Sequence, residues 1–227
     1  MTIENSLDTH AAKMARRKAA RDRMLAEKTI ERGLVLVHTG AGKGKSTAAF
    51  GLAVRALGQG MRVGIVQFVK GAWTSGERKL FEFLSTALDD MNADRADNYS
   101  DDADDEGENF GSISVEILGE GFTWETQDRD RDRLAALRGW EAAKRLLTDD
   151  YCDMVILDEL NIVLRDDLLP ISEVLAVLAA RPPHQHVIIT GRNAKAELID
   201  FADLVTEMTL VKHPFRQGVK AQRGVEF

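Results

Sequence analysis

The sequence predicts an α/β protein with a mostly parallel sheet flanked by helices. From residue 33 onwards, short apolar runs rich in Val, Ile and Leu alternate with longer amphipathic stretches. This alternation is typical of a parallel sheet with right-handed crossovers. The first apolar run, residues 34–37, also passes into a glycine-rich turn that begins a helix at residue 47. In such sheets ligands bind at the C-terminal ends of the strands, so functional residues are expected there.

The elements follow from the apolar runs, their periods and the residues that interrupt them. Strands are expected where short β-branched runs occur, at residues 34–38, 62–68, 113–118, 154–157, 186–190 and 204–211. Helices are expected at residues 47–57, 76–88, 128–148, 172–180 and 194–201, with a short helical stretch after the fourth strand. Gly58 and Gly60 end the first of these helices, and Pro182 ends the fourth.

The N-terminal segment lies outside this alternation. Residues 8–30 are rich in Ala, Lys, Arg and Glu, which predicts a helix that is polar on most faces. Residues 1–32 are therefore interpreted as a helical extension of a domain that covers residues 33–227. Asp22, Glu27 and Glu31 disfavour the alternative of a targeting peptide, because such peptides are poor in acidic residues.

An acidic segment interrupts the alternation before the third strand. Residues 89–108 hold ten Asp or Glu and one Arg. This stretch cannot bury enough apolar surface to offset its ordering entropy, so a mobile insertion is expected at about 89–112. A calcium site in this segment is an alternative, but the acidic run lacks the full EF-hand loop pattern.

Composition and charge exclude several functional classes. The chain has 227 residues, of which 44% are hydrophobic and 30% charged, as in a soluble globular protein. No apolar run approaches the roughly 18–20 residues that cross a membrane, so no membrane association is expected. A chain with one cysteine is expected in a reducing cytoplasm. The net charge of −7 disfavours nucleic-acid binding. Cys152 is the single cysteine, which excludes an internal disulfide, and it is interpreted as a small core residue rather than a nucleophile.

The turn after the first strand has the residues of a phosphate-binding loop. It ends in Gly44-Lys45-Ser46, which matches the end of the pattern G-x-x-x-x-G-K-[ST]. Backbone N–H groups of residues 42–46 and the positive end of the following helix can face phosphate oxygens. Lys45 adds a point charge, and the Ser46 hydroxyl can bind Mg²⁺ on the phosphates. The sequence therefore predicts a P-loop NTPase-like (RecA-like) fold with a triphosphate site.

The match to this pattern has one departure. Thr39 stands where the pattern has its first glycine, which indicates a variant loop. The alternative of a plain glycine-rich turn is disfavoured, because Lys43, Lys45 and Ser46 stand where a phosphate needs them. The candidate nucleotide-binding residues of the loop are Gly40, Ala41, Gly42, Lys43, Gly44, Lys45, Ser46 and Thr47.

Two acidic residues follow the apolar run of the fourth strand. In a P-loop fold this strand end lies near the loop, so Asp158 and Glu159 can complete the magnesium shell that Ser46 begins. The Asn-Lys-x-Asp pattern of GTPases and the Leu-Ser-Gly-Gly-Gln pattern of transporter ATPases do not occur in the sequence. The phosphate site is clear, whereas the usual phosphoryl-transfer machinery is not.

A glycine-flanked loop after the third strand holds Phe122 and Trp124. From composition alone, Trp124 is interpreted as a core or interface residue. The alternative is that the loop covers a large flat ligand, because aromatic side chains supply much contact area at low entropic cost.

Six stretches of the chain together resemble one known family, the bacterial P-loop ATP:corrinoid (cob(I)alamin) adenosyltransferases. The matching stretches are residues 39–55, 66–77, 121–127, 154–161, 181–192 and 212–224. The resemblance implies transfer of the 5′-deoxyadenosyl group of ATP to the cobalt of a reduced corrinoid, with release of triphosphate. The resemblance implies cob(I)alamin or cob(I)yrinic acid a,c-diamide as the corrinoid, and Mg²⁺ as the ion that accompanies ATP. The alternative kept beside it is a RecA-like ATPase that forms ADP and phosphate.

The resemblance also implies roles for individual residues. Lys45 is the main cation on the triphosphate, and Ser46, Glu159 and the adjacent Asp158 belong to the metal site. Arg55 is implied to lie near the nucleotide. Phe122 and Trp124 are implied to pack beneath the corrin ring and to displace its lower axial ligand, which eases reduction to cobalt(I).

The family further implies a homodimer, in which the N-terminal helix covers the partner's corrinoid site, and a flavin-type electron donor. The sequence departs from the family pattern at two loop positions and in one segment. Ala41 replaces an Asn, Ser46 replaces a Thr, and the acidic segment is atypical.

Overall fold

A computed structural model describes residues 3–69, 76–97, 110–117 and 129–226. The chain divides into two compact units, Met1–Arg32 and Gly33–Phe227. In the first unit, helix α1 spans Ile3–Ala26, and its described side chains from residue 10 onwards are exposed. The expected helix over residues 8–30 is wrong at both ends, since α1 begins at Ile3 and ends at Ala26, and Thr29 and Ile30 beyond it are poor helix formers.

The second unit is built on one parallel sheet. Its strands are β1 (Val35–Thr39), β2 (Val63–Gln67), β3 (Ile113–Ile117), β4 (Met154–Asp158), β5 (His186–Thr190) and β6 (Leu204–Glu207). All pairings are parallel, and the order across the sheet is β3-β2-β4-β5-β1-β6. Strand β5 therefore lies between β1 and β4, the two strands whose ends carry the sequence motifs. The predicted α/β fold with a P-loop NTPase-like parallel sheet is confirmed.

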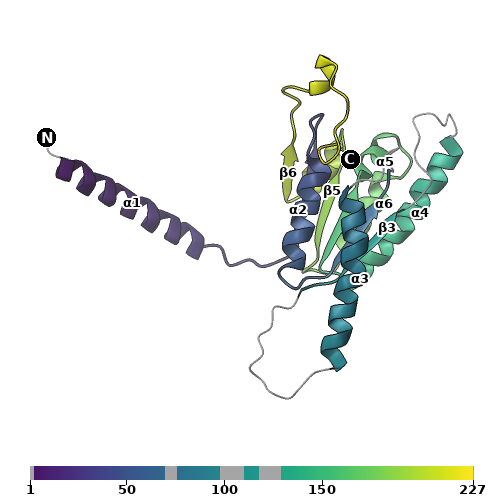
Figure 1. Ribbon diagram of the computed structural model, residues 1–227, viewed down its shortest axis with the longest axis horizontal. Coiled ribbons are helices and arrows are strands. Elements are labelled where there is room, and N and C mark those ends of the chain that lie inside the picture. The colour runs from purple at the N-terminus through teal and green to yellow at the C-terminus, as the bar shows by residue number, and fades with distance from the viewer. Residues whose placement is uncertain (1–2, 70–75, 98–109, 118–128, 227) are drawn as a thin grey trace. The chain divides into compact units, whose positions relative to one another are not determined.

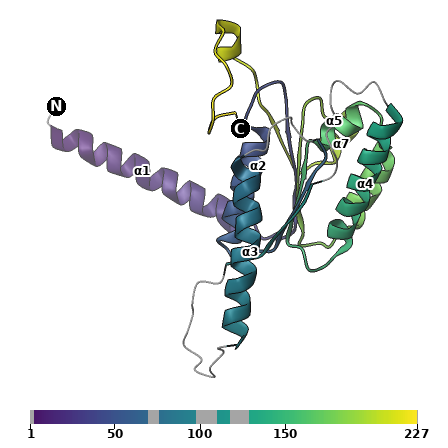
Figure 2. The same cartoon turned by 45° about the vertical axis from the view of Figure 1, so that its right-hand side comes forward.

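Helices cover both faces of this sheet. They are α2 (Lys45–Leu57), α3 (Gly76–Asp97), α4 (Arg129–Thr148), α5 (Leu160–Arg165), α6 (Ile171–Ala180) and α7 (Ala196–Phe201), followed by the 3₁₀ turn η1 (Pro214–Gln217). Helices α2 and α3 lie on one face, and α4, α5 and α7 lie on the other (Figures 1 and 2). None of the described helices is long and apolar enough to cross a membrane.

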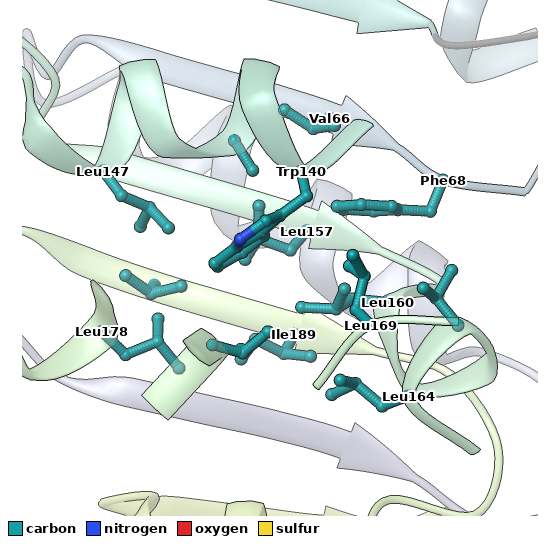
Figure 3. Close-up of a cluster of buried hydrophobic side chains, with 14 of the residues drawn as sticks. Val66, Phe68, Trp140, Leu147, Leu157, Leu160, Leu164, Leu169, Leu178 and Ile189 are labelled. Carbon is teal, nitrogen blue, oxygen red and sulfur yellow. The ribbon is translucent and has the colours of Figure 1, made fainter. Parts of the chain in front are cut away.

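Each face of the sheet has its own apolar core. Figure 3 shows the larger core, in which Trp140 of α4 lies over the strands and packs near Leu157 and Ile189. The Trp140 indole Nε1–H donates to Glu173 Oε1 at 2.7 Å, which joins α4 to α6. The other core contains Phe50 of α2 and Phe81 of α3, whose rings meet edge to face at 5.4 Å. Burial of these side chains fixes the sheet between the two helical layers.

The structure corrects two expected boundaries in the second unit. Helix α3 continues to Asp97, so residues 89–97 are helical rather than the start of a loop. Phe81 and Leu88 anchor the helix in the core, and good helix formers such as Met91 and Ala93 extend it at one hydrogen bond per residue. Residues 98–109 of the expected insertion lie outside the described part of the chain.

The last strand is shorter than expected, since β6 ends at Glu207 and not at residue 211. Glu207 is in register with Thr39, the last residue of β1, so no strand remains beyond it to pair with. The chain turns there across the glycine-rich loop. The Met208 N–H donates to Thr39 O at 2.8 Å, and the Gly42 N–H donates to Met208 O at 2.6 Å.

Candidate nucleotide and metal site

The glycine-rich loop joins β1 to α2, and two of its glycines have positive φ. Gly40 has φ 94° and Gly44 has φ 101°, a region that L side chains rarely adopt. Close packing adds a second constraint, because a Cβ atom on Gly40 would lie 2.5 Å from the carbonyl oxygen of Met208. The same oxygen would lie 2.7 Å from a Cβ atom on Gly42. These three glycines are therefore required by the shape of the loop.

The loop ends at the positive end of α2. Gly44 is the N-cap residue and has no side chain with which to cap the helix. The first turn, Lys45 to Thr47, has no acidic residue. Its N–H groups and the helix dipole therefore favour an anion at this end. Ser46 is half-buried and Thr47 is exposed at this start of the helix.

Lys45 is a buried cation folded back onto the loop. Its Nζ donates to Gly42 O at 2.5 Å and to Gly40 O at 3.0 Å. Burial lowers the pKa of Lys45 below its usual value, and Glu159 opposes this effect. Arg192 lowers the pKa further, so Lys45 lies within electrostatic reach of both Glu159 and Arg192. A phosphate oxygen at this position would replace carbonyl dipoles by a full negative charge, a stronger partner for the ammonium group.

Asp158 closes β4, and both of its carboxylate oxygens have partners. Oδ1 accepts a hydrogen bond from the Thr190 hydroxyl at 2.7 Å, and Oδ2 accepts one from Gln67 Nε2 at 3.0 Å. The side chain is almost fully buried, with 1% of its surface exposed. Asp158 is therefore held in place by side chains from β2 and β5.

Glu159 differs from Asp158 because one of its carboxylate oxygens has no hydrogen-bond partner among the described residues. It has φ 63°, an uncommon backbone conformation for a residue other than glycine. Its Oε2 is buried and has no hydrogen-bond partner among the described residues. Burial and, next, the Asp158 carboxylate raise the pKa of Glu159 to about 7, while Lys45 and Arg192 oppose the shift. An unpartnered buried carboxylate oxygen beside two cations is a candidate ligand for a metal ion on an anion.

These donors fit Mg²⁺ held together with phosphates rather than by protein alone. No group of three or more His, Cys, Asp or Glu side chains that could hold a metal occurs in the described ranges. Mg²⁺ at phosphate sites uses one or two carboxylates, water and phosphate oxygens, and it does not require such a cluster. The free oxygen of Glu159 and the hydroxyl of Ser46 match that donor set.

The structure brings together most of the predicted site residues. The loop residues Gly40 to Thr47 lie at the ends of β1 and α2, and the charge of Lys45 interacts with Glu159 and Asp158. Arg55 is an exception, because it lies exposed in the last turn of α2. Ten residues of helix place it roughly 15 Å from Lys45 along the axis. Phe122 and Trp124 lie outside the described residues.

Several site residues were not singled out from the sequence. Thr190 and Arg192 follow the apolar run of β5, and their importance depends on β5 lying between β1 and β4. His38 is buried in β1, and its Nδ1 lies 3.3 Å from Lys45 O. The available signal was a polar residue at the end of each apolar strand, which also describes Gln67 at the end of β2.

The C-terminal segment also reaches the loop. Lys43 forms an ion pair with Glu226, and Figure 1 shows the C-terminal end beside the upper end of α2. The Glu226 N–H donates to Gln222 O at 2.9 Å, which shapes the segment into a turn. The carboxylate of Glu226 is thus paired with one of the cations of the loop, Lys43.

The parallel sheet and the glycine-rich loop define a protein with a P-loop NTPase-like fold. A family model described as "ATP:corrinoid adenosyltransferase BtuR/CobO/CobP" matches residues 31–227. A second model, "Cob(I)alamin adenosyltransferase N terminal", matches residues 2–25. The chain therefore belongs to the ATP:corrinoid adenosyltransferase family, which is a family of enzymes, and the resemblance inferred from the sequence is confirmed.

Curated relatives cover nearly the whole chain. A corrinoid adenosyltransferase of a Sinorhizobium species is 50% identical over 220 residues, which is 96% of this chain and 91% of the relative. A corrinoid adenosyltransferase of Pseudomonas aeruginosa is 46% identical and covers 96% of this chain and 95% of its own length. The corrinoid adenosyltransferase CobA of Salmonella typhimurium is 43% identical, and the match covers 91% of each chain.

Proposed function

We propose that this protein transfers the 5′-deoxyadenosyl group of ATP to the cobalt of a reduced corrinoid and releases triphosphate. The corrinoid substrate is cob(I)alamin or cob(I)yrinic acid a,c-diamide. The observation that carries the proposal is the pairing of Lys45 with the positive end of α2, opposite Glu159, in a chain of this family. Family membership does not favour the alternative of a RecA-like ATPase that forms ADP and phosphate.

In the proposed reaction, the charge that most needs stabilisation develops on the leaving group, triphosphate. The cobalt(I) centre attacks the ribose 5′ carbon, and the bond from that carbon to the triphosphate oxygen breaks. The negative charge that develops on triphosphate is stabilised by donors that are already in place. Lys45, Lys43 and Arg192 supply cations around the loop, and the helix start supplies N–H groups.

Mg²⁺ is part of the proposal, with Ser46 and Glu159 as the residues that hold it beside the phosphates. When bound there, the ion supplies positive charge that further stabilises the departing triphosphate. Asp158, beside Glu159 at the end of β4, belongs to the same metal site, and each of its oxygens accepts one hydrogen bond and keeps a lone pair.

The remaining parts of the proposal concern the corrinoid. Phe122 and Trp124 pack against the corrin ring and displace its lower axial ligand, so that a flavin-type donor can reduce cobalt(II) more easily. The protein works as a homodimer in the cytoplasm, with its N-terminal helix near the partner's corrinoid site. Support for these points comes from the family resemblance.

A spectroscopic assay tests the proposed reaction. The protein is incubated without oxygen with ATP, Mg²⁺ and chemically reduced cobalamin, and the visible spectrum is followed for formation of the cobalt–carbon bond. We expect adenosylated product and ATP consumption that both require the corrinoid. A Lys45→Met variant serves as the matched inactive control. ATP consumption at the same rate without corrinoid, and no change in the corrinoid spectrum, would contradict the proposal.

A further inference from the structure

Thr190 is placed between the two motifs of the site. It is the last residue of β5, the strand between β1 and β4, and it is fully buried. On one side it is in register with His38 of β1, whose ring approaches the backbone of Lys45. On the other side its side chain faces the end of β4. No other described strand contacts both the loop strand and the acidic strand.

A single hydroxyl group joins Thr190 to both acidic residues. The Thr190 hydroxyl donates to Asp158 Oδ1 at 2.7 Å, and Thr190 Oγ1 accepts from the Glu159 backbone N–H at 2.9 Å. A hydroxyl has one proton to donate, and here it is donated to the Asp158 carboxylate. The hydroxyl oxygen uses a lone pair to accept the Glu159 N–H. The hydroxyl therefore fixes the side chain of Asp158 and the backbone of Glu159 at the same time.

The backbone of Glu159 needs such a partner. Glu159 has φ 63° and ψ 19°, is the N-cap residue of α5, and has no side-chain capping bond. Its own N–H is therefore not satisfied within the helix. Conformations of this kind persist only where the surrounding structure holds them.

The residue after Thr190 confines the Glu159 side chain. A Cβ atom on Gly191 would lie 3.0 Å from Glu159 Oε2 and 2.8 Å from Asn161 Cβ. The end of β5 thus contacts both the backbone and the carboxylate of Glu159. The carboxylate oxygen Oε2 is left without a hydrogen-bond partner in the described structure, and the charge of Glu159 interacts with the loop cation Lys45.

We propose that Thr190 is a positioning residue, which sets the conformation in which Glu159 presents its free carboxylate oxygen to a divalent cation on the loop-bound triphosphate. The inference rests on the proposed function for the metal site, and it adds a residue from β5 to it. Thr190 itself touches neither nucleotide nor cation. A purely structural role, in which the hydroxyl only satisfies buried Asp158, predicts loss of stability without a change in cation affinity.

The test measures cation binding directly and needs no corrinoid. Mn²⁺, a paramagnetic substitute for Mg²⁺, is titrated into the full chain in the presence of inorganic tripolyphosphate, and free Mn²⁺ is measured by electron paramagnetic resonance. Thr190→Val should weaken Mn²⁺ binding about 10- to 100-fold, as other losses of a ligand-orienting partner do. Tripolyphosphate affinity without metal should stay unchanged, and Thr190→Ser should restore Mn²⁺ binding because it keeps the hydroxyl.

A matched control and a second variant keep the test decisive. Thr206→Val makes the same change on the exposed strand β6 and should leave Mn²⁺ binding unaltered. If Thr190→Val does not fold, Thr190→Ala replaces it, because the smaller side chain leaves room for water beside Asp158. Wild-type Mn²⁺ affinity in the folded variant, or equal weakening in Thr190→Ser and Thr190→Val, overturns the proposal. Absence of corrinoid adenosylation by the wild-type chain would instead count against the proposed function.

Discussion

The ammonium group of Lys43 forms an ion pair with the carboxylate of Glu226. Lys43 belongs to the glycine-rich loop, and its side chain is 54% exposed, whereas that of Glu226 is 15% exposed. A triphosphate that uses Lys43 must displace this carboxylate. The tail therefore competes with the ligand for one cation, while Lys45 makes its hydrogen bonds within the loop.

Glu226→Gln removes the competing charge and keeps the shape of the side chain. It should raise the affinity for tripolyphosphate by up to about fivefold at low salt, because exposed ion pairs are worth roughly 1 kcal/mol or less. Isothermal titration calorimetry at two salt concentrations checks this, and the gain should shrink as salt screens the pair. Glu197→Gln, an exposed carboxylate on α7, is the control. Weaker binding in Glu226→Gln would mean that the tail helps to hold the ligand.

Lys45→Met keeps the apolar stem of a buried side chain and removes its charge. We expect kcat/KM for ATP to fall by about 10²- to 10³-fold, because one preorganised donor to developing charge is worth roughly 3–4 kcal/mol. Steady-state kinetics with reduced cobalamin measures the loss. Lys43→Met should cost far less, since that cation is largely exposed. Equal losses in the two variants would show that burial of Lys45 confers no special role.

The raised pKa of Glu159 predicts how stability depends on pH. Its pKa is about 7 in the fold against 4.5 normally, so the folded state binds the proton more tightly than the unfolded chain does. The stabilising effect of that proton is present at low pH and is lost as pH rises through about 7. Above pH 7 the buried charge therefore costs stability, by roughly 3 kcal/mol at most.

Glu159→Gln removes this cost. Without nucleotide or metal, the variant should be more stable than the wild type at pH 8, and the difference should vanish below about pH 4, where the carboxyl is protonated in both states. Urea denaturation across this range measures it. Asp200→Asn, on the exposed surface of α7, is the control variant and should follow the wild-type curve. A stability difference that does not change with pH would show that the Glu159 carboxylate ionises normally.

Trp124→Ala tests the proposed role of the aromatic loop. Loss of the indole ring should impair reaction with cobalt(II) substrate and added reductant more than reaction with pre-reduced cobalt(I), because the ring acts by excluding the lower axial ligand. Initial rates with each substrate form decide the matter, with Trp140→Phe as a tryptophan control in the core. Equal losses with both forms would reject an axial-ligand role.

The repeating order of strands and helices could be predicted from the sequence, because apolar runs and glycine or proline breakers are local signals. The loop residues Gly40 to Thr47 and the two acids at the end of β4 were found for the same reason. The end of α3 at Asp97 was not, since an acidic composition predicts solvation and does not distinguish a solvated helix from a loop.

The rest of the site depends on which strands are neighbours. Thr190 matters because β5 lies between β1 and β4, and strand order is not encoded in any local pattern. Arg55 shows the converse: it belongs to a stretch that resembles the family, yet helix geometry carries it away from the loop. The Lys43–Glu226 pair joins residues far apart in the chain and had no sequence signal.

The central claim is that the glycine-rich loop holds a triphosphate leaving group while a corrinoid cobalt attacks ribose. Phosphorus NMR of the products, after anaerobic reaction with ATP, Mg²⁺ and reduced cobalamin, tests it most directly. The account predicts tripolyphosphate in a one-to-one ratio with adenosylated corrinoid, and neither product when corrinoid is omitted. ADP and orthophosphate as the products, formed equally well without corrinoid, would contradict it.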